Sequence, residues 1–138
     1  MILIAIMLGV GWRAFDDALA YVKERKQFGR PIGSFQALQH RIADLATDLQ
    51  AARLMTHWVA ALNDADPDRM LPQQASMVKL FVTEVAKRTT LEGMQMMGGY
   101  GYSSEYDMER LVRSSLVSTI YGGTSEIQRG IIAKTLGL

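Results

Sequence analysis

The sequence predicts an all-α domain: an up-down four-helix bundle with one additional short helix. Three observations lead to this prediction. Apolar residues recur at intervals of three and four along several segments, the period of a helix packed on one face. Glycine and proline cluster between these segments, where turns are expected. No alternation of apolar and polar residues extends over a useful length, so no sheet competes with the bundle.

The first predicted helix covers about residues 1–25. Residues 1–12 are apolar on all sides, and from there the helix becomes amphipathic, with Ala14, Ala18 and Val22 facing inwards. The apolar stretch is shorter than the ~20 residues of a membrane span and lacks the basic region and cleavage site of a signal peptide. No N-cap precedes it, so we expect that the helix is cut and that the chain is a fragment, a truncated reading frame or the product of a wrongly assigned start.

The second predicted helix extends to about Ala65. It follows segment 27–33, whose glycines and proline interrupt the first helix, and Ser34 is its expected N-cap. Segment 64–68 is polar, contains proline and should form a turn. The apolar residues at helical spacing in this helix are Leu38, Ile42, Leu45, Leu49, Ala52, Val59 and Leu62.

The third predicted helix has Pro72 in its first turn and ends before Gly98. Its inward face carries Ala75, Val78, Val82, Val85 and Thr89. A loop over residues 99–104 and a short helix over about 107–116 should follow. The last helix begins after two glycines, with Thr124 or Ser125 as N-cap. We expect a capping box of Ser125 and Gln128, and an inward face of Ile127, Ile131, Ile132 and Leu136.

Composition limits the possible functions. With 138 residues, of which 49% are hydrophobic and 21% charged, the chain is large enough for one globular domain. A net charge of +1 gives no reason to expect a nucleic-acid surface, and the lack of cysteine excludes disulfide and thiol chemistry. Neither His40 nor His57 has a glutamate three residues earlier, so no metal site is predicted. We expect a cytoplasmic protein without nucleic-acid or membrane partners.

Residues 120–129 carry the clearest functional signal, with the sequence IYGGTSEIQR. Two glycines allow positive φ angles and close approach of another molecule. The capped helix that follows offers free amide groups and a positive dipole end to a phosphate or carbonyl oxygen. On local chemistry alone, an ordinary junction between a loop and a helix is the favoured explanation of this segment.

Three separated motifs resemble the acyl-CoA dehydrogenase family. They are ERKQFGRPI at residues 24–32, QMMGGYGY at 95–102 and YGGTSEIQR at 121–129, in the order and approximate spacing of that family. The resemblance covers essentially the whole chain, residues 1–138, but only the C-terminal helical domain of the family. It implies the same helical fold, an FAD cofactor and α,β-desaturation of acyl-CoA thioesters. The N-terminal helical and middle β domains of the family are absent from the sequence.

The resemblance also assigns cofactor-binding residues. In the family, the arginine matched by Arg25 reaches FAD from a neighbouring subunit, and an arginine fork suits pyrophosphate oxygens. The residues matched to FAD contacts are Arg25, Phe28, Gln36, Gln95, Met96, Met97, Gly98, Gly99, Thr124, Ser125 and Glu126. Structural roles stay open for the same residues: a solvated cation for Arg25, a core plug for Phe28, helix packing for Gln36 and a helix C-cap for Gly98 and Gly99.

Tyr121, Gly122 and Gly123 match the substrate-binding segment, but Gly122 departs from the family pattern. Many members carry the catalytic glutamate there, and glycine cannot remove a proton. In a branch resembling the isovaleryl and long-chain enzymes, the base is on the first helix, and by alignment it would fall immediately before Met1. We therefore expect no catalytic residue within the chain and no activity of the chain alone.

The resemblance implies partners as well. These are an acyl-CoA substrate in the full-length parent and an electron-transfer flavoprotein or similar electron acceptor. The apolar first helix favours a homodimer or homotetramer. Arg25, Gln36, Gln95 and residues 124–126 are expected to form one cluster only across subunits. Two alternatives are a non-catalytic oligomerising helical module and a flavin oxidase resembling nitroalkane oxidase.

Overall fold

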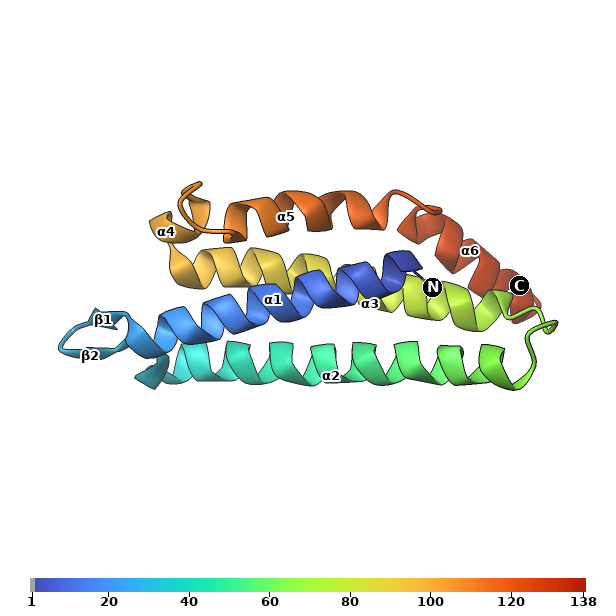
Figure 1. The fold of residues 1–138 in the computed structure, drawn as a ribbon, viewed down its shortest axis with the longest axis horizontal. Helices are drawn as coiled ribbons and strands as arrows, with labels where there is room; N and C mark the ends of the chain where they lie inside the picture. Colours follow the sequence, from blue (N-terminus) through green and yellow to red (C-terminus); the bar gives the residue numbers. More distant parts are fainter. Residues whose placement is uncertain (1) are drawn as a thin grey trace.

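The computed structural model describes residues 2–138 and has six helices, as Figure 1 shows. Three of them are long, and the others are shorter helices that follow in the C-terminal part of the chain. The helices are α1 (Ile2–Glu24), α2 (Gln36–Ala65), α3 (Pro72–Met97), α4 (Gly99–Tyr102), α5 (Met108–Leu116) and α6 (Ser125–Thr135). The remaining elements are the strands β1 (Lys26–Gln27) and β2 (Arg30–Pro31) and the 3-10 turns η1 (Ile32–Ser34) and η2 (Val117–Thr119).

The arrangement confirms the predicted up-down bundle. Helices α1, α2 and α3 run along the long axis in alternating directions, and α5 followed by α6 takes the fourth position (Figure 1). Helix α3 is central, because it packs against α1, α2, α5 and α6. The β1–β2 hairpin and α4 lie at one end of the bundle, and α6 lies toward the other (Figure 1). Among residues 2–138, none of the helices has the length and apolarity that crossing a membrane requires.

Each long helix contributes an apolar stripe to one core. Ala14, Ala18 and Val22 of α1 are buried as predicted. Gly11 lets α1 and α2 approach closely, because a Cβ atom there would lie 2.9 Å from Leu49 Cδ2. The stripe of α3 is continued by buried threonines, and Thr90 Oγ1 lies 2.7 Å from Ser115 Oγ of α5. The core is therefore apolar between α1, α2 and α3 and partly polar where α3 meets α5.

The expected inward face of α6 is wrong for two of its four residues. Ile127 and Leu136 are 57% and 62% exposed, whereas Ile131 and Ile132 are half-buried. At the start of α6 the buried residues are polar: Ser125 and Gln128 bond to Glu84 and to the preceding turn. Apolar spacing alone therefore failed at the two ends of the predicted stripe.

Two local predictions also need correction. Ser34 does not cap α2: its Oγ donates to Pro31 O, and Phe35 precedes the helix without a side-chain cap. Segment 27–33 interrupts the first helix as predicted and contains paired residues, with Gln27 opposite Arg30. Residues 99–104 are not entirely loop, because Gly99–Tyr102 forms the short helix α4.

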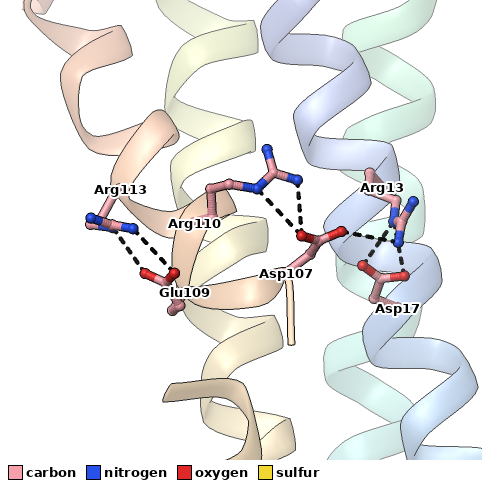
Figure 2. Close-up of polar contacts among 6 residues, drawn as sticks. All are labelled: Arg13, Asp17, Asp107, Glu109, Arg110 and Arg113. Carbon is pink, nitrogen blue, oxygen red and sulfur yellow. Dashed lines mark hydrogen bonds and ion pairs between the residues drawn. The ribbon is translucent and has the colours of Figure 1, made fainter. Parts of the chain in front are cut away.

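Ion pairs fix the start of α5 against α1, as Figure 2 shows. Arg13 bonds Asp17 on its own helix, and its Nη2 lies 3.5 Å from Asp107 Oδ2. Arg110 Nη2 lies 3.0 Å from the other oxygen of Asp107. Exposed ion pairs each contribute little free energy, but Asp107 here joins two helices at the end of the loop after α4.

Candidate functional site

The first candidate region is a groove at the hairpin end of the bundle, with a volume of about 600 Å³. We call it the hairpin-end groove. It lies between the end of α1 and the junction of α3 with α4. Its lining residues are Tyr21, Arg25, Gln27, Ile32, Gln95, Met96, Met97, Gly98, Gly99, Tyr100, Ser103 and Glu105.

Arg25 supplies the cationic wall of this groove. It is exposed directly after α1, and its guanidinium carbon lies 5.6 Å from the centre of the Tyr100 ring. Tyr100 also contacts Tyr21 and Tyr106, with ring centres 6.1 and 5.8 Å apart. A cation next to exposed aromatic rings can hold a group that combines a phosphate with a flat ring.

Bare backbone and an apolar floor complete the groove. Gly98 has a φ of 61°, and nothing lies within 4 Å of a Cβ atom placed at Gly98 or Gly99. This exposed backbone allows close approach of a ligand. Met96 and Met97 are only 6% and 4% exposed and belong to the core, so they form the floor beneath the glycines.

Phe28 and Gln36 lie outside the lining of the groove. Phe28 is at the hairpin tip with a φ of 53°, and it is 91% exposed. Its ring meets Phe35 edge-on at 6.1 Å. The core-plug alternative for Phe28 is therefore wrong. Gln36 begins α2 and is exposed. Within one chain, neither residue joins the other predicted cofactor contacts.

The second candidate region is residues 121–126, which we call the glycine turn. Gly122 and Gly123 have φ angles of 62° and 91°, which favour glycine. Gln128 Nε2 donates to Gly122 O at 3.0 Å and to Gly123 O at 3.3 Å. Lys79 Nζ of α3 donates to Gly123 O at 2.7 Å. The carbonyl groups of Gly122 and Gly123 are thus both held by side chains from inside the protein.

Side chains also attach the turn to α6 and α3. Thr124 is the N-cap of α6, as one of the two predicted candidates, and its Oγ1 accepts from Ile127 N at 3.4 Å. Ser125 Oγ instead donates to Glu84 Oε1 of α3 at 2.8 Å. The predicted capping box of Ser125 and Gln128 is therefore wrong, because both side chains have other partners.

A further groove of about 670 Å³ lies beside the glycine turn, between the starts of α1 and α3 and helix α6. Tyr121 and Gly122 line it together with Leu3. A Cβ atom at Gly122 would lie 3.6 Å from Leu3 Cδ1. Among the described residues, the lining contains no carboxylate, and Lys79 is its one formally charged side chain.

Three groups at this end have shifted acidities. Burial lowers the pKa of Lys79, an effect that Glu84 and Glu126 partly oppose. Burial raises the pKa of Tyr121. A hydrogen bond from its own backbone amide and one from Thr124 lower the pKa of Glu126. Glu126 therefore stays ionised near the positive end of α6, as expected of a helix-dipole residue.

The structure separates the predicted cofactor residues into two groups. Arg25 and residues 95–99 line one groove of a single chain, so this part of the cluster needs no second subunit. Residues 124–126 belong to the glycine turn and share neither that groove nor its end of the bundle (Figure 1). The expectation of one cluster formed only across subunits is therefore wrong for Arg25 and Gln95. Its remaining part, the joining of both groups by association, stays a prediction.

Sequence reasoning missed Lys79, Gln128 and Tyr100. Lys79 is only 9% exposed and lies one residue after the buried Val78, on the inward stripe of α3. A lysine within an apolar stripe was the available signal, because charged side chains are rarely buried without a partner. Gln128 carried no comparable signal, since its role depends on the glycine carbonyls that it reaches.

Comparison with known proteins identifies what the chain is similar to. The family model described as "Acyl-CoA dehydrogenase, C-terminal domain" matches residues 1–137. The short/branched chain specific acyl-CoA dehydrogenase of Rattus norvegicus mitochondria is 46% identical over 130 residues, covering 94% of this chain and 30% of the relative.

Solved structures of similar proteins superpose on nearly the whole chain. An acyl-CoA dehydrogenase from Geobacillus kaustophilus superposes with a TM-score of 0.92 at 35% identity, covering 99% of this chain and 35% of that one. The FAD complex of PigA superposes with a TM-score of 0.89 at 34% identity, covering 98% and 35%. The chain thus spans about a third of the length of these proteins.

Proposed function

This chain belongs to the acyl-CoA dehydrogenase family as a C-terminal helical domain, and from that premise we propose that it serves FAD-dependent α,β-desaturation of an acyl-CoA thioester. The observation that carries the proposal is the shared groove of Arg25 and residues 95–99. These residues come from two motifs about 70 positions apart, and the fold brings them together around bare glycine backbone.

The hairpin-end groove fits the adenosine and phosphate half of FAD. Arg25 would pair with phosphate oxygens, and the Tyr100 ring beside it offers a stacking surface. Gly98 and Gly99 leave room for direct contact with the backbone. Met96 and Met97 exclude water from below. The role proposed for these residues is to bind and orient.

The glycine turn fits the other half of the site. The carbonyls of Gly122 and Gly123 face inwards, so the turn can present amide groups at the start of α6, which carries a positive dipole end. We propose that residues 124–126 contact the cofactor and that residues 121–123 line the substrate pocket. A bound flavin supplies the acceptor for the hydride that leaves the β-carbon.

The proton acceptor is proposed to come from the α1 side of the turn. Gly122 has no side chain, and the nearest atom to a Cβ placed there belongs to Leu3. The two base positions of the family, residue 122 and the position immediately before Met1, would then face one place. A carboxylate on the preceding turn of α1 would reach the region that a glutamate at 122 would occupy.

The rest of the proposal concerns assembly. Residues 1–138 would be one domain of a longer enzyme, whose N-terminal helical and middle β domains enclose the flavin and the acyl-CoA. Subunit association as a homodimer or homotetramer would bring the groove of one chain to the turn of another. Exposed apolar side chains such as Ile2, Ile6 and Ile127 support association. An electron-transfer flavoprotein or similar acceptor would reoxidise the cofactor.

A chimeric enzyme tests this function. The matching C-terminal third of the Geobacillus kaustophilus acyl-CoA dehydrogenase is replaced by residues 2–138. We expect a folded oligomer that retains flavin, detected by its visible absorbance, while residues 2–138 alone retain little because the ring lacks its other walls. A folded, oligomeric chimera without flavin would contradict the proposal.

Adding acyl-CoA to the flavin-bound chimera tests the base. Bleaching of the flavin with Gly122 unchanged is expected if a carboxylate upstream of residue 2 acts as base in the host. If bleaching appears only in Gly122→Glu, the host has its base at the turn. In that case the position proposed for the native enzyme is tested by placing a glutamate on the helical turn before Ile2.

A further inference from the structure

We infer that Lys79 is a positioning residue of the glycine turn: its ammonium group fixes the peptide between Gly123 and Thr124 in the orientation that a ligand meets. This inference deepens the proposed function and rests on it for its consequence in catalysis. Its geometrical part rests on the contacts of residues 79, 122, 123 and 128 alone.

The contacts of Lys79 are unusual for a lysine. Its side chain belongs to the inward stripe of α3 and is 9% exposed. Nζ reaches across to a different part of the chain and donates to Gly123 O at 2.7 Å, a short charge-assisted hydrogen bond. An ammonium group hydrates strongly, so its burial at this point is costly unless the carbonyl receives it. The pairing with the turn is thus the reason that the lysine can be buried.

The bond determines which way the peptide faces. The carbonyl and amide groups of a trans peptide point in opposite directions, and none of the described peptide bonds is cis. Because Lys79 holds Gly123 O toward α3, the amide of Thr124 points away from α3. Gln128 holds Gly122 O in the same way, and it thereby fixes the direction of the Gly123 amide. Within residues 2–138, neither amide donates a hydrogen bond to another group.

Without these bonds the two glycine peptides lose the side-chain contacts that hold their carbonyl groups inwards. Both glycines have positive φ angles, and glycine populates positive and negative φ about equally. A flip of the Gly123–Thr124 peptide would direct a carbonyl oxygen, instead of an amide, at an anionic or carbonyl-bearing ligand. Gln128 Nε2 is 3.3 Å from Gly123 O but also serves Gly122 O, so Lys79 is the dedicated donor of this peptide.

The test compares backbone order in four forms of the 138-residue chain by ¹⁵N relaxation. They are the wild type, Lys79→Met, Lys79→Arg and the control Lys87→Met, which lies two helical turns further along α3. We expect order parameters of residues 122–124 to fall from about 0.85 to below about 0.6 in Lys79→Met, with the core unchanged. Lys79→Arg should keep them near the wild-type value, because it retains a donor.

Equal order in the wild type and Lys79→Met, or an equal loss in Lys87→Met, would overturn the inference. If Lys79→Met does not fold, Lys79→Gln replaces it, because its shorter amide keeps polarity but cannot span the distance to Gly123. A general loss of stability would lower order throughout α3 and not at the turn alone.

The chimera separates this inference from the proposed function. There, Lys79→Met should weaken flavin retention by about tenfold, since the amide of Thr124 would turn away from the cofactor that residues 124–126 are proposed to contact. If Lys79→Met disorders the turn but the chimera never binds flavin, the role of Lys79 is supported and the proposed function is contradicted. If the turn stays ordered and the chimera with Lys79→Met is fully active, the proposed function is supported and the role of Lys79 is contradicted.

Discussion

The two candidate regions differ in how their backbone is held. At the glycine turn, the carbonyls of Gly122 and Gly123 are bonded to the buried Gln128 and Lys79, and Thr124 caps the helix that follows. At the hairpin-end groove, the backbone is held by main-chain bonds, such as those from Arg25 N to Tyr21 O and from Gly98 N to Met94 O, and the Arg25 side chain lies over the Tyr100 ring at the surface.

This difference indicates a division of labour. A turn that must present specific atoms is fixed by buried hydrogen bonds, whose loss leaves unsatisfied groups at full cost. A groove that clasps part of a large cofactor can remain open until the ligand and a second subunit complete it. The buried Ser125 and Gln128 of α6 belong to the first case, and the exposed Arg25 beside the groove belongs to the second.

The largest expected effect on stability is at Gly123. In Gly123→Ala, the new Cβ would lie 2.6 Å from Gln128 Nε2, so Gln128 must move away and lose its bonds to the turn. With the strain of a φ near 91°, we expect a loss of about 2–4 kcal/mol in the free energy of unfolding. Gly122→Ala meets only Leu3 at 3.6 Å and should lose about 1–2 kcal/mol. Urea unfolding measures both, and equal losses would show that Gln128 does not hold the turn.

A pair of glutamines sharpens the comparison. Gln128→Leu removes both bonds to the turn and leaves Gly122 O without a donor, which should cost about 1–3 kcal/mol. Gln95→Leu changes an exposed side chain at the groove and should stay within about 0.5 kcal/mol of the wild type. Urea unfolding measures the free energy of unfolding of both variants. A loss in Gln95→Leu as large as that in Gln128→Leu would mean that the groove is as tightly held as the turn.

The sequence predicted the bundle well because its signals are local. The stripes of α1 and α3, Pro72 at the start of α3 and the glycine pair before α6 are each visible within a few residues. Arg25 and residues 95–99, which the motifs predict to be parts of one cofactor site, line the same groove, and their role in binding stays a prediction.

The remaining features depend on partners far along the chain. Lys79 reaches Gly123, 44 residues later, and Ser125 reaches Glu84, so neither bond can be read from local spacing. The same bonds explain why Ser125 and Gln128 are buried at the start of α6, while Ile127 is exposed. Phe28 was weighed as a core plug because an aromatic residue between two helices suggests burial, whereas the hairpin carries it outwards. The sequence-based predictions failed where a side chain bonds to a group far along the chain.

A smaller effect should follow from the acidity of Lys79. Its pKa is lowered by burial below the ordinary value of 10.5, so the unfolded chain binds more protons as pH rises from the lowered pKa toward 10.5. Stability should therefore rise with pH across this window relative to Lys79→Met. Glu84 and Glu126 face the ammonium and oppose the shift.

Tyr121 contributes with the opposite sign at higher pH, because its raised pKa makes the folded state hold its proton longer. Subtracting the curve of Lys79→Met from that of the wild type isolates the lysine, and Tyr121→Phe isolates the tyrosine. Thermal unfolding at a series of alkaline pH values provides the data. A wild-type curve parallel to that of Lys79→Met would mean that burial does not lower the pKa of the ammonium group.

A small effect on stability is expected at Arg25, and it separates binding from folding. Two exposed arginines lie over aromatic rings at similar distances: Arg25 at 5.6 Å from Tyr100 and Arg53 at 5.8 Å from Trp12. An exposed contact of this kind contributes about 0.5–1 kcal/mol, so Arg25→Ala and Arg53→Ala should lower the free energy of unfolding by similar, small amounts. In the flavin-bound chimera, however, only Arg25→Ala should weaken flavin retention, because only Arg25 lines the groove proposed for the phosphates. Equilibrium dialysis against FAD measures this difference. If both variants release flavin equally, the groove is an ordinary surface feature, and the glycine turn alone carries the cofactor site.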